Sequence, residues 1–215
     1  MNHIIFGTKN SYNDWGLTLK TRPVVSPPNP IYEKVQIKGR DGALDLTEAL
    51  DGEVHYEDRK ITAEFNVIDA VKTWDEKISK ILNYLQGQKM KITLSSDEDY
   101  YYLGRCKIND FTSNKKIGKL VIECEVEPYK YKQNVTVDSR SVSSGNSYTY
   151  TNDRKSVIPI ITNSADMTLE YNGNAYTISA GTNKILDIKF IEGNNTIAVT
   201  NGSGTLKLEY QEASL

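Results

Sequence analysis

Few residues of this 215-residue chain have the types and spacing that catalysis or metal binding requires. The two histidines, His3 and His55, lie far apart in the sequence, and neither has a partner at the spacing of a metal site or a general base. We interpret His55 as an ordinary strand residue. No serine stands in the G-x-S-x-G turn that exposes a catalytic nucleophile.

Three consecutive acids, Asp97, Glu98 and Asp99, form the densest carboxylate cluster. A glycosidase needs two carboxyl groups on either side of a sugar, and neighbouring residues of one turn do not set that separation. A calcium loop is also excluded, because alternating oxygen ligands and a closing glutamate are missing. We interpret the cluster as exposed turn acids and keep a glycan-cleaving enzyme as a third hypothesis.

The cysteines and tyrosines favour packing over chemistry. Cys106 and Cys124 fall on neighbouring predicted strands and point toward the same apolar face, so we expect two buried thiols in a sheet core. Two cysteines form neither a disulfide framework nor a zinc site by themselves. Tyrosines 100–102 alternate between opposite faces of a strand, so they do not form one stacking platform. The sequence predicts no metal, no cofactor and no enzyme.

The charge balance excludes two classes of partner. The net charge is −2, from 26 basic and 28 acidic residues, and no polybasic run draws the chain to nucleic acid or to an anionic membrane. The first residues lack the basic region and the long apolar run of a signal peptide, and no segment is long enough to span a bilayer. We therefore expect synthesis in a reducing cytosol.

The elements that would position any site are mostly strands. Alternating apolar residues predict strands over 34–38, 61–67, 90–94, 100–108 and 120–126. One helix is predicted near residues 70–86, with Asp69 as its N-cap, Gly87 as its stop and an apolar face formed by Val71, Trp74, Ile78, Ile81, Leu82 and Leu85. We predict an α+β N-terminal domain of antiparallel strands over residues 1–132.

The rest of the chain has a different texture. Residues 138–156 are polar and serine-rich, with only short strand-like pieces. Asn172 and Gly173 favour a hairpin turn, and a second turn over 201–204 separates two further alternating runs. With no helical period after residue 133, we predict an all-β sandwich over residues 133–215, which makes the fold mainly β.

The segment over residues 39–65 contains many charges and several glycines but no cluster with obvious chemistry. Its order of motifs resembles the N-terminal domain of siphophage distal tail proteins. The resemblance rests on the G-x-L-D-L-T turn that ends at Thr47, on Tyr56, Arg59 and Ile61 before the next strand, and on the following tryptophan-bearing helix. The late motif of Gly193, Asn195 and Ile197 resembles the galectin-like sandwich that ends many family members.

The resemblance implies a structural role at the tail tip of a virion, assembled in the bacterial host cytoplasm. It implies a homo-hexameric ring of N-terminal domains, with the sandwiches projecting outward. The implied partners are other copies of the chain, the tail tube protein, a tail-tip or tail-associated protein, and receptor-binding or baseplate proteins. DNA would pass through the ring lumen without specific binding. No membrane contact is implied.

The resemblance also directs attention to the charged segment as the contact between subunits, since a loop with both signs of charge can pair with a neighbour. The predicted interface residues are Arg40, Asp41, Asp45, Glu48, Tyr56 and Arg59. The alternative hypothesis is a non-catalytic carbohydrate-binding β-sandwich protein. However, the second domain lacks the residue set by which galectins hold galactosides, and the chain shows no inserted carbohydrate-binding module, so the likeness concerns shape alone.

Overall fold

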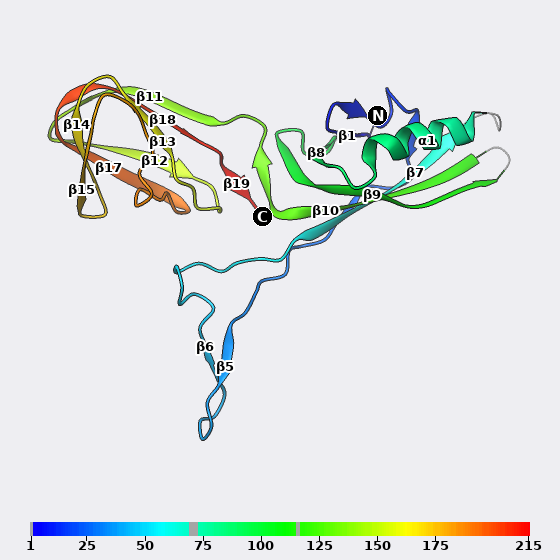
Figure 1. Ribbon diagram of the computed structural model, residues 1–215, viewed down its shortest axis with the longest axis horizontal. Helices are drawn as coiled ribbons and strands as arrows, with labels where there is room; N and C mark the ends of the chain where they lie inside the picture. The colour runs from blue at the N-terminus through cyan, green and yellow to red at the C-terminus, as the bar shows by residue number, and fades with distance from the viewer. Residues whose placement is uncertain (1, 69–72, 115–116) are drawn as a thin grey trace. The chain divides into compact units, whose positions relative to one another are not determined.

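The computed structural model describes residues 2–68, 73–114 and 117–215, and its fold is mainly β, as the sequence predicted (Figure 1). The chain divides into two compact units. Unit 1 comprises Met1–Lys130 with Leu215, and unit 2 comprises Tyr131–Ser214. That residues 1–132 and 133–215 form two independently folding domains stays a prediction.

Unit 1 is built on one large antiparallel sheet in the order β2-β1-β8-β9-β10-β7-β3, with β4 also paired to β7. Its strands are β1 (Ile4–Phe6), β2 (Lys9–Asn10), β3 (Leu17–Leu19), β4 (Val24–Val25), β7 (Arg59–Ile68), β8 (Lys89–Leu94), β9 (Tyr100–Asn114) and β10 (Ile117–Lys132). Strands β10 and β7 pair over a long register, from Ile117 opposite Ile68 to Val126 opposite Arg59. This sheet is the platform from which the exposed segments of unit 1 extend.

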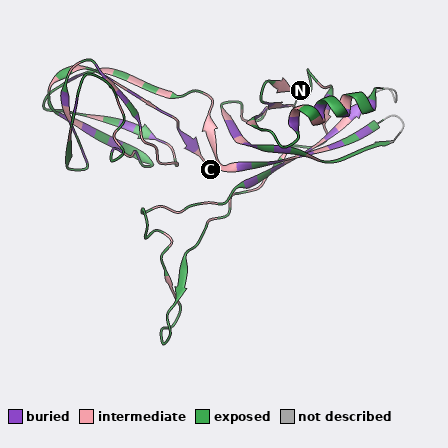
Figure 2. Ribbon diagram, in the orientation of Figure 1, coloured by how far each residue is buried: buried purple, intermediate pink, exposed green. Residues whose placement is uncertain are grey.

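The predicted helix is α1 (Trp74–Leu85), which covers one face of this sheet. Its buried side chains are Trp74, Ile78, Ile81 and Leu85, and they fall at helical spacing. The predicted N-cap Asp69 and the predicted core residue Val71 lie outside the described residues. Figure 2 shows the buried residues alternating with exposed ones along the strands.

Two glycines of unit 1 allow close packing that any side chain would prevent. A Cβ at Gly118 would collide with the indole ring of Trp74, so the first turn of α1 rests directly on the backbone of β10. A Cβ at Gly104 in β9 would lie 2.5 Å from the Cα of Val126 in β10. Because real Cβ atoms do not approach so closely, both positions are restricted to glycine.

Unit 2 is a sandwich of two four-stranded antiparallel sheets, with orders β11-β18-β13-β16 and β12-β17-β14-β15. The eight strands of the sandwich are β11 (Thr136–Ser143), β12 (Asn146–Asn152), β13 (Ile160–Asn163), β14 (Met167–Tyr171), β15 (Asn174–Ile178), β16 (Gly181–Asn183), β17 (Gly193–Asn201) and β18 (Ser203–Tyr210). The terminal strand β19 (Ala213–Ser214) lies outside both four-stranded sheets. Its core includes Ile161, Leu169 and Leu206, all fully buried. That the sandwich is galectin-like stays a prediction.

The turn predictions in unit 2 are confirmed. Asn172 and Gly173 have φ of 51° and 79°, as the tight hairpin between β14 and β15 requires. Two other predictions are wrong. The polar stretch over 138–156 contributes to two full strands, β11 and β12, whose exposed side chains within this stretch are polar. His55 is not a strand residue but lies in the irregular chain before the isolated bridge at Tyr56.

Candidate assembly surface

The charged segment singled out in the sequence forms an arm, which we define as residues 30–56. It begins and ends where Pro30 and Tyr56 form an isolated antiparallel bridge. Within it, β5 (Lys34–Gln36) and β6 (Ala43–Asp45) pair only with each other, as a separate two-stranded sheet. Figure 1 shows the arm leaving the large sheet of unit 1 and extending away from it.

The arm exposes apolar side chains that a free hairpin has no reason to carry. Val35 is 48% exposed and Leu50 is 92% exposed, and the other large apolar residues exposed on the arm are Ile31, Tyr32, Ile37 and Leu46. A two-stranded hairpin without a core is only marginally stable in water. Six large exposed apolar residues within one short segment favour a contact site for another macromolecule.

Local hydrogen bonds nevertheless give the arm a defined shape. The Thr47 backbone N–H and hydroxyl both donate to Asp45, and the Glu33 backbone N–H donates to the Thr47 hydroxyl at 3.1 Å. The bonds from Thr47 lower the pKa of the Asp45 carboxyl. At the base of the arm, the Ile31 N–H donates to the His55 carbonyl at 2.8 Å. The arm is therefore an ordered hairpin with an exposed apolar surface.

Four of the six predicted interface residues lie on this arm and are exposed. Arg40 and Asp41 occupy the loop between β5 and β6, where Gly39 and Gly42 have positive φ of 84° and 74°. Asp45 ends β6, and Glu48 follows it. The last two help to line a shallow hollow of about 380 Å³, together with Tyr32, Thr47, Ala49 and Val54.

The other two predicted residues stand at the root of the arm. The Tyr56 ring packs edge-on against the Tyr129 ring, with centroids 6.0 Å apart. Arg59 is 6% exposed, and its guanidinium lies 4.8 Å from the centroid of the Tyr102 ring. Its Nε and Nη2 atoms have no hydrogen-bond partner among the described residues, and burial lowers the pKa of the guanidinium. The structure therefore places Arg59 inside unit 1, apart from the exposed residues of the arm.

The face of the large sheet opposite α1 carries a ladder of ion pairs, which sequence reasoning missed. The Glu64 carboxylate lies 3.1 Å from the ammonium groups of both Lys20 and Lys119. The same arrangement recurs around Glu123, with Lys60 at 3.6 Å and Lys107 at 3.0 Å. Three of these pairs join neighbouring strands, and Lys20 directly follows β3. The charged positions that alternate with the core residues of β7 and β10 were the available signal.

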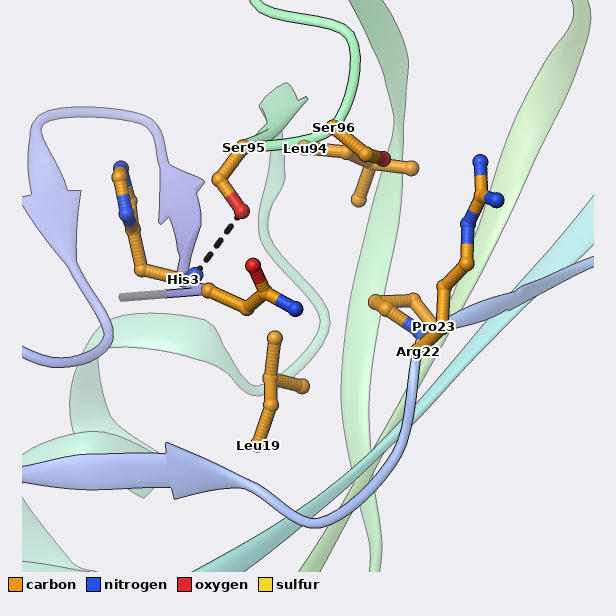
Figure 3. A pocket seen from close by; sticks show the side chains of 8 residues that line it. His3, Leu19, Arg22, Pro23, Leu94, Ser95 and Ser96 are labelled. Carbon is orange, nitrogen blue, oxygen red and sulfur yellow. Dashed lines mark hydrogen bonds between the residues drawn. The ribbon is translucent and has the colours of Figure 1, made fainter.

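A pocket of about 320 Å³ lies in unit 1 and is lined by Asn2, His3, Leu19, Arg22, Pro23, Leu94, Ser95 and Ser96. Figure 3 shows His3 and Arg22 on opposite sides of it. The backbone N–H of His3 donates to the Ser95 hydroxyl at 3.0 Å. No carboxylate lines the pocket, so the described residues do not arrange an acid–base pair there.

The structure also shows where the acidic cluster and the two cysteines lie. Asp97 accepts a hydrogen bond from the Lys130 ammonium at 2.7 Å, while Glu98 and Asp99 are exposed in the turn before β9. Over residues 2–68, 73–114 and 117–215, no three His, Cys, Asp or Glu side chains gather into a potential metal site. The two cysteines are buried thiols on neighbouring strands, as the sequence predicted.

An ordered arm with exposed apolar and charged side chains is typical of a structural protein that assembles with other chains. Residues 13–137, more than half of the chain, match the family model described as the phage tail protein RIFT-related domain. The chain therefore belongs to this family of phage tail proteins, and a tail protein is part of the virion.

One solved structure with the same fold is the Dit (gp 19.1) protein of phage SPP1, described as a paradigm of the hub adsorption apparatus in phages that infect Gram-positive bacteria. The two chains align with a TM-score of 0.65 and 15% sequence identity, and the alignment covers 100% of each. The comparison with curated proteins found no match. Within the described residues, no helix has the length and apolar character to cross a membrane.

Proposed function

We propose that this protein is the ring-forming hub of a phage tail tip, linking the tail tube to the tip and receptor-binding apparatus. The observation that carries the proposal is the arm. Its exposed apolar side chains gain burial only when another chain covers them, and its two strands leave their outer edges available for pairing. A second copy of this chain is the proposed partner.

A closed ring of identical subunits needs two different complementary surfaces on each subunit. The arm supplies one surface, with Arg40, Asp41, Asp45 and Glu48 offering both signs of charge to a neighbour. Tyr56 and Arg59 act from the root, where they fix the direction in which the arm leaves the sheet. We propose a homo-hexamer as the state of this ring, as the resemblance to siphophage distal tail proteins implies.

The proposed partners of the ring are the tail tube protein, a tail-tip or tail-associated protein, and receptor-binding or baseplate proteins. DNA passes through the lumen without specific binding, and the protein has no catalytic role. The paired lysines on the large sheet support this view, since cations held by carboxylates are poorly placed to retain DNA. Assembly takes place in the cytoplasm of the bacterial host.

The test compares the size of the full-length protein with that of an arm variant carrying Val35→Ser, Ile37→Ser and Leu50→Ser. A matched control carries Leu186→Ser and Ile191→Ser, which are exposed apolar positions in unit 2. Multi-angle light scattering, together with electron microscopy of purified tails, reports the ring. We expect the arm variant to lose the ring and the control to keep it. A ring that survives the arm substitutions contradicts the proposal.

A further inference from the structure

The two cysteines of the chain meet inside the large sheet of unit 1. Cys106 lies on β9 and Cys124 on β10, which run side by side in Figure 1, and each residue is 1% exposed. The Cys124 thiol donates to the Cys106 sulfur, with the two Sγ atoms 2.8 Å apart. The mainly apolar side chains of the unit 1 core surround them.

The backbone explains why the side chains approach so closely. The Cys106 N–H donates to the Gln88 carbonyl at 3.2 Å, and the Cys106 carbonyl accepts from the Gly87 N–H at 2.8 Å. In an antiparallel sheet, the N–H and C=O of one residue point to the same side, so those of Cys106 point away from β10. Cys106 therefore faces β10 at a position without hydrogen bonds, where opposed side chains are closest.

A second pair of residues fixes the register. The close approach between Gly104 and Val126 places these two residues opposite each other. Two residues further along each antiparallel strand, Cys106 and Cys124 are then directly opposed on the same face. A directly opposed pair without hydrogen bonds has the Cα separation, about 4.5 Å, at which a disulfide closes without backbone movement.

The environment keeps the pair reduced during synthesis. The hydrogen bond to Cys106 and burial raise the pKa of the Cys124 thiol, so the reactive thiolate is scarce at neutral pH. A reducing cytosol leaves such thiols unoxidised. Outside the cell, the same protein meets oxidants without a thiol pool to reverse them. Local opening of the sheet over long times would expose the buried thiols to a small neutral oxidant.

We propose that Cys106 and Cys124 form a modification site that closes to an intramolecular disulfide when the virion meets a peroxide-class oxidant. One thiolate sulfur attacks the peroxide, which becomes water as the sulfur becomes a sulfenic acid. The second sulfur then displaces water from the sulfenic acid. In sum, two thiols and hydrogen peroxide give one disulfide and two waters. The bond would tie β9 to β10. It requires only the tail location and is independent of the hub role.

The test treats the purified full-length protein with hydrogen peroxide at mildly alkaline pH, unfolds it, and labels the remaining thiols with N-ethylmaleimide. We expect the intact mass to fall by two hydrogen atoms and labelling to disappear. A reductant should restore labelling at both residues. The variants Cys106→Ser and Cys124→Ser serve as matched controls, since each keeps one thiol that has no partner.

A stability measurement distinguishes the native register from a bond made in the unfolded chain. We expect the melting temperature of the oxidised protein to exceed that of the reduced protein by about 5 °C or more, with no such rise in either serine variant. Persistent labelling of both thiols, oxygen addition without loss of hydrogen, dimers on a non-reducing gel, or a lower melting temperature after oxidation would each overturn the proposal.

Discussion

Two hairpins of this chain have similar alternating sequences, but one buries its apolar side chains and the other exposes them. In the β14–β15 hairpin, Met167, Leu169 and Tyr171 point inward and are almost fully buried in the core of unit 2. In the arm, Val35 and Leu46 stand at similar alternating positions but remain exposed. The difference lies outside the strands, because the β14–β15 hairpin belongs to a sandwich with a facing sheet, whereas the described residues form no such sheet against the arm.

This contrast separates two uses of apolar residues. In the sandwich they stabilise the fold of one chain, whereas on the arm they stay exposed and, under the proposed function, a second chain buries them. Substitutions in the arm should therefore change assembly and leave the fold intact, and substitutions in the cores should do the reverse. The two tryptophans, Trp15 and Trp74, both lie in unit 1, so their fluorescence reports the unfolding of that unit separately.

The largest difference is expected between Leu169→Ala and Val35→Ala. Leu169 is fully buried, so its truncation should lower the free energy of unfolding by about 2–5 kcal/mol. The arm substitution should change it by less than about 0.5 kcal/mol. Differential scanning calorimetry of both variants measures the effects. Equal losses in the two variants would show that the arm belongs to the folded core.

A smaller difference is expected between two glycine substitutions. Gly118→Ala pushes a methyl group into the Trp74 ring and should cost about 1–3 kcal/mol through overpacking. Gly39→Ala meets open space, so only its positive φ of 84° opposes the change, at about 1 kcal/mol confined to the arm. Denaturant titration followed by tryptophan fluorescence should detect the first substitution and not the second.

A substitution of Arg59 is expected to affect stability and assembly in opposite directions. Its buried guanidinium has two nitrogens without partners, so Arg59→Met should raise the free energy of unfolding of unit 1 by about 1 kcal/mol or less. The same variant should weaken the ring if the root fixes the direction of the arm. Lys60→Met, the exposed neighbour, is the control. A loss of more than about 2 kcal/mol would show that Arg59 stabilises the fold.

The smallest expected effect is the loss of folding stability at acidic pH. Hydrogen bonds from Lys119 and Lys20 lower the pKa of Glu64, so this carboxylate stabilises the folded state above its unfolded pKa. That stability should be lost as the pH falls from about 4.5 through the lower folded pKa. Glu64→Gln should flatten this part of the pH dependence of the denaturant midpoint in tryptophan fluorescence. An unchanged slope would mean that the ladder contributes nothing measurable.

The sequence predicted elements whose signals are local. The helical spacing of Trp74, Ile78 and Ile81 identified α1, and the Asn172-Gly173 pair identified the β14–β15 turn. It did not predict that a polar, serine-rich stretch forms β11 and β12. Alternating serines and threonines are compatible both with the outer face of a sandwich strand and with a loop. Which structure forms depends on packing against the opposite sheet, which is not visible in the local sequence.

The candidate site was predictable in part for a related reason. The motif that ends at Thr47 located the arm, but sequence did not distinguish exposed Arg40 from buried Arg59, since both are charged residues next to strands. Burial of Arg59 depends on Tyr102, which lies on β9 and is remote in sequence. The ion-pair ladder likewise depends on which strands become neighbours.

The geometry of the arm also makes it prone to aggregation. The two unpaired strand edges of a protruding hairpin favour unspecific stacking into fibrils at high protein concentration. Lys34 and Lys38, both exposed along this hairpin, set like charges against each other in any such stack. The lysines thus oppose unspecific stacking of the hairpin.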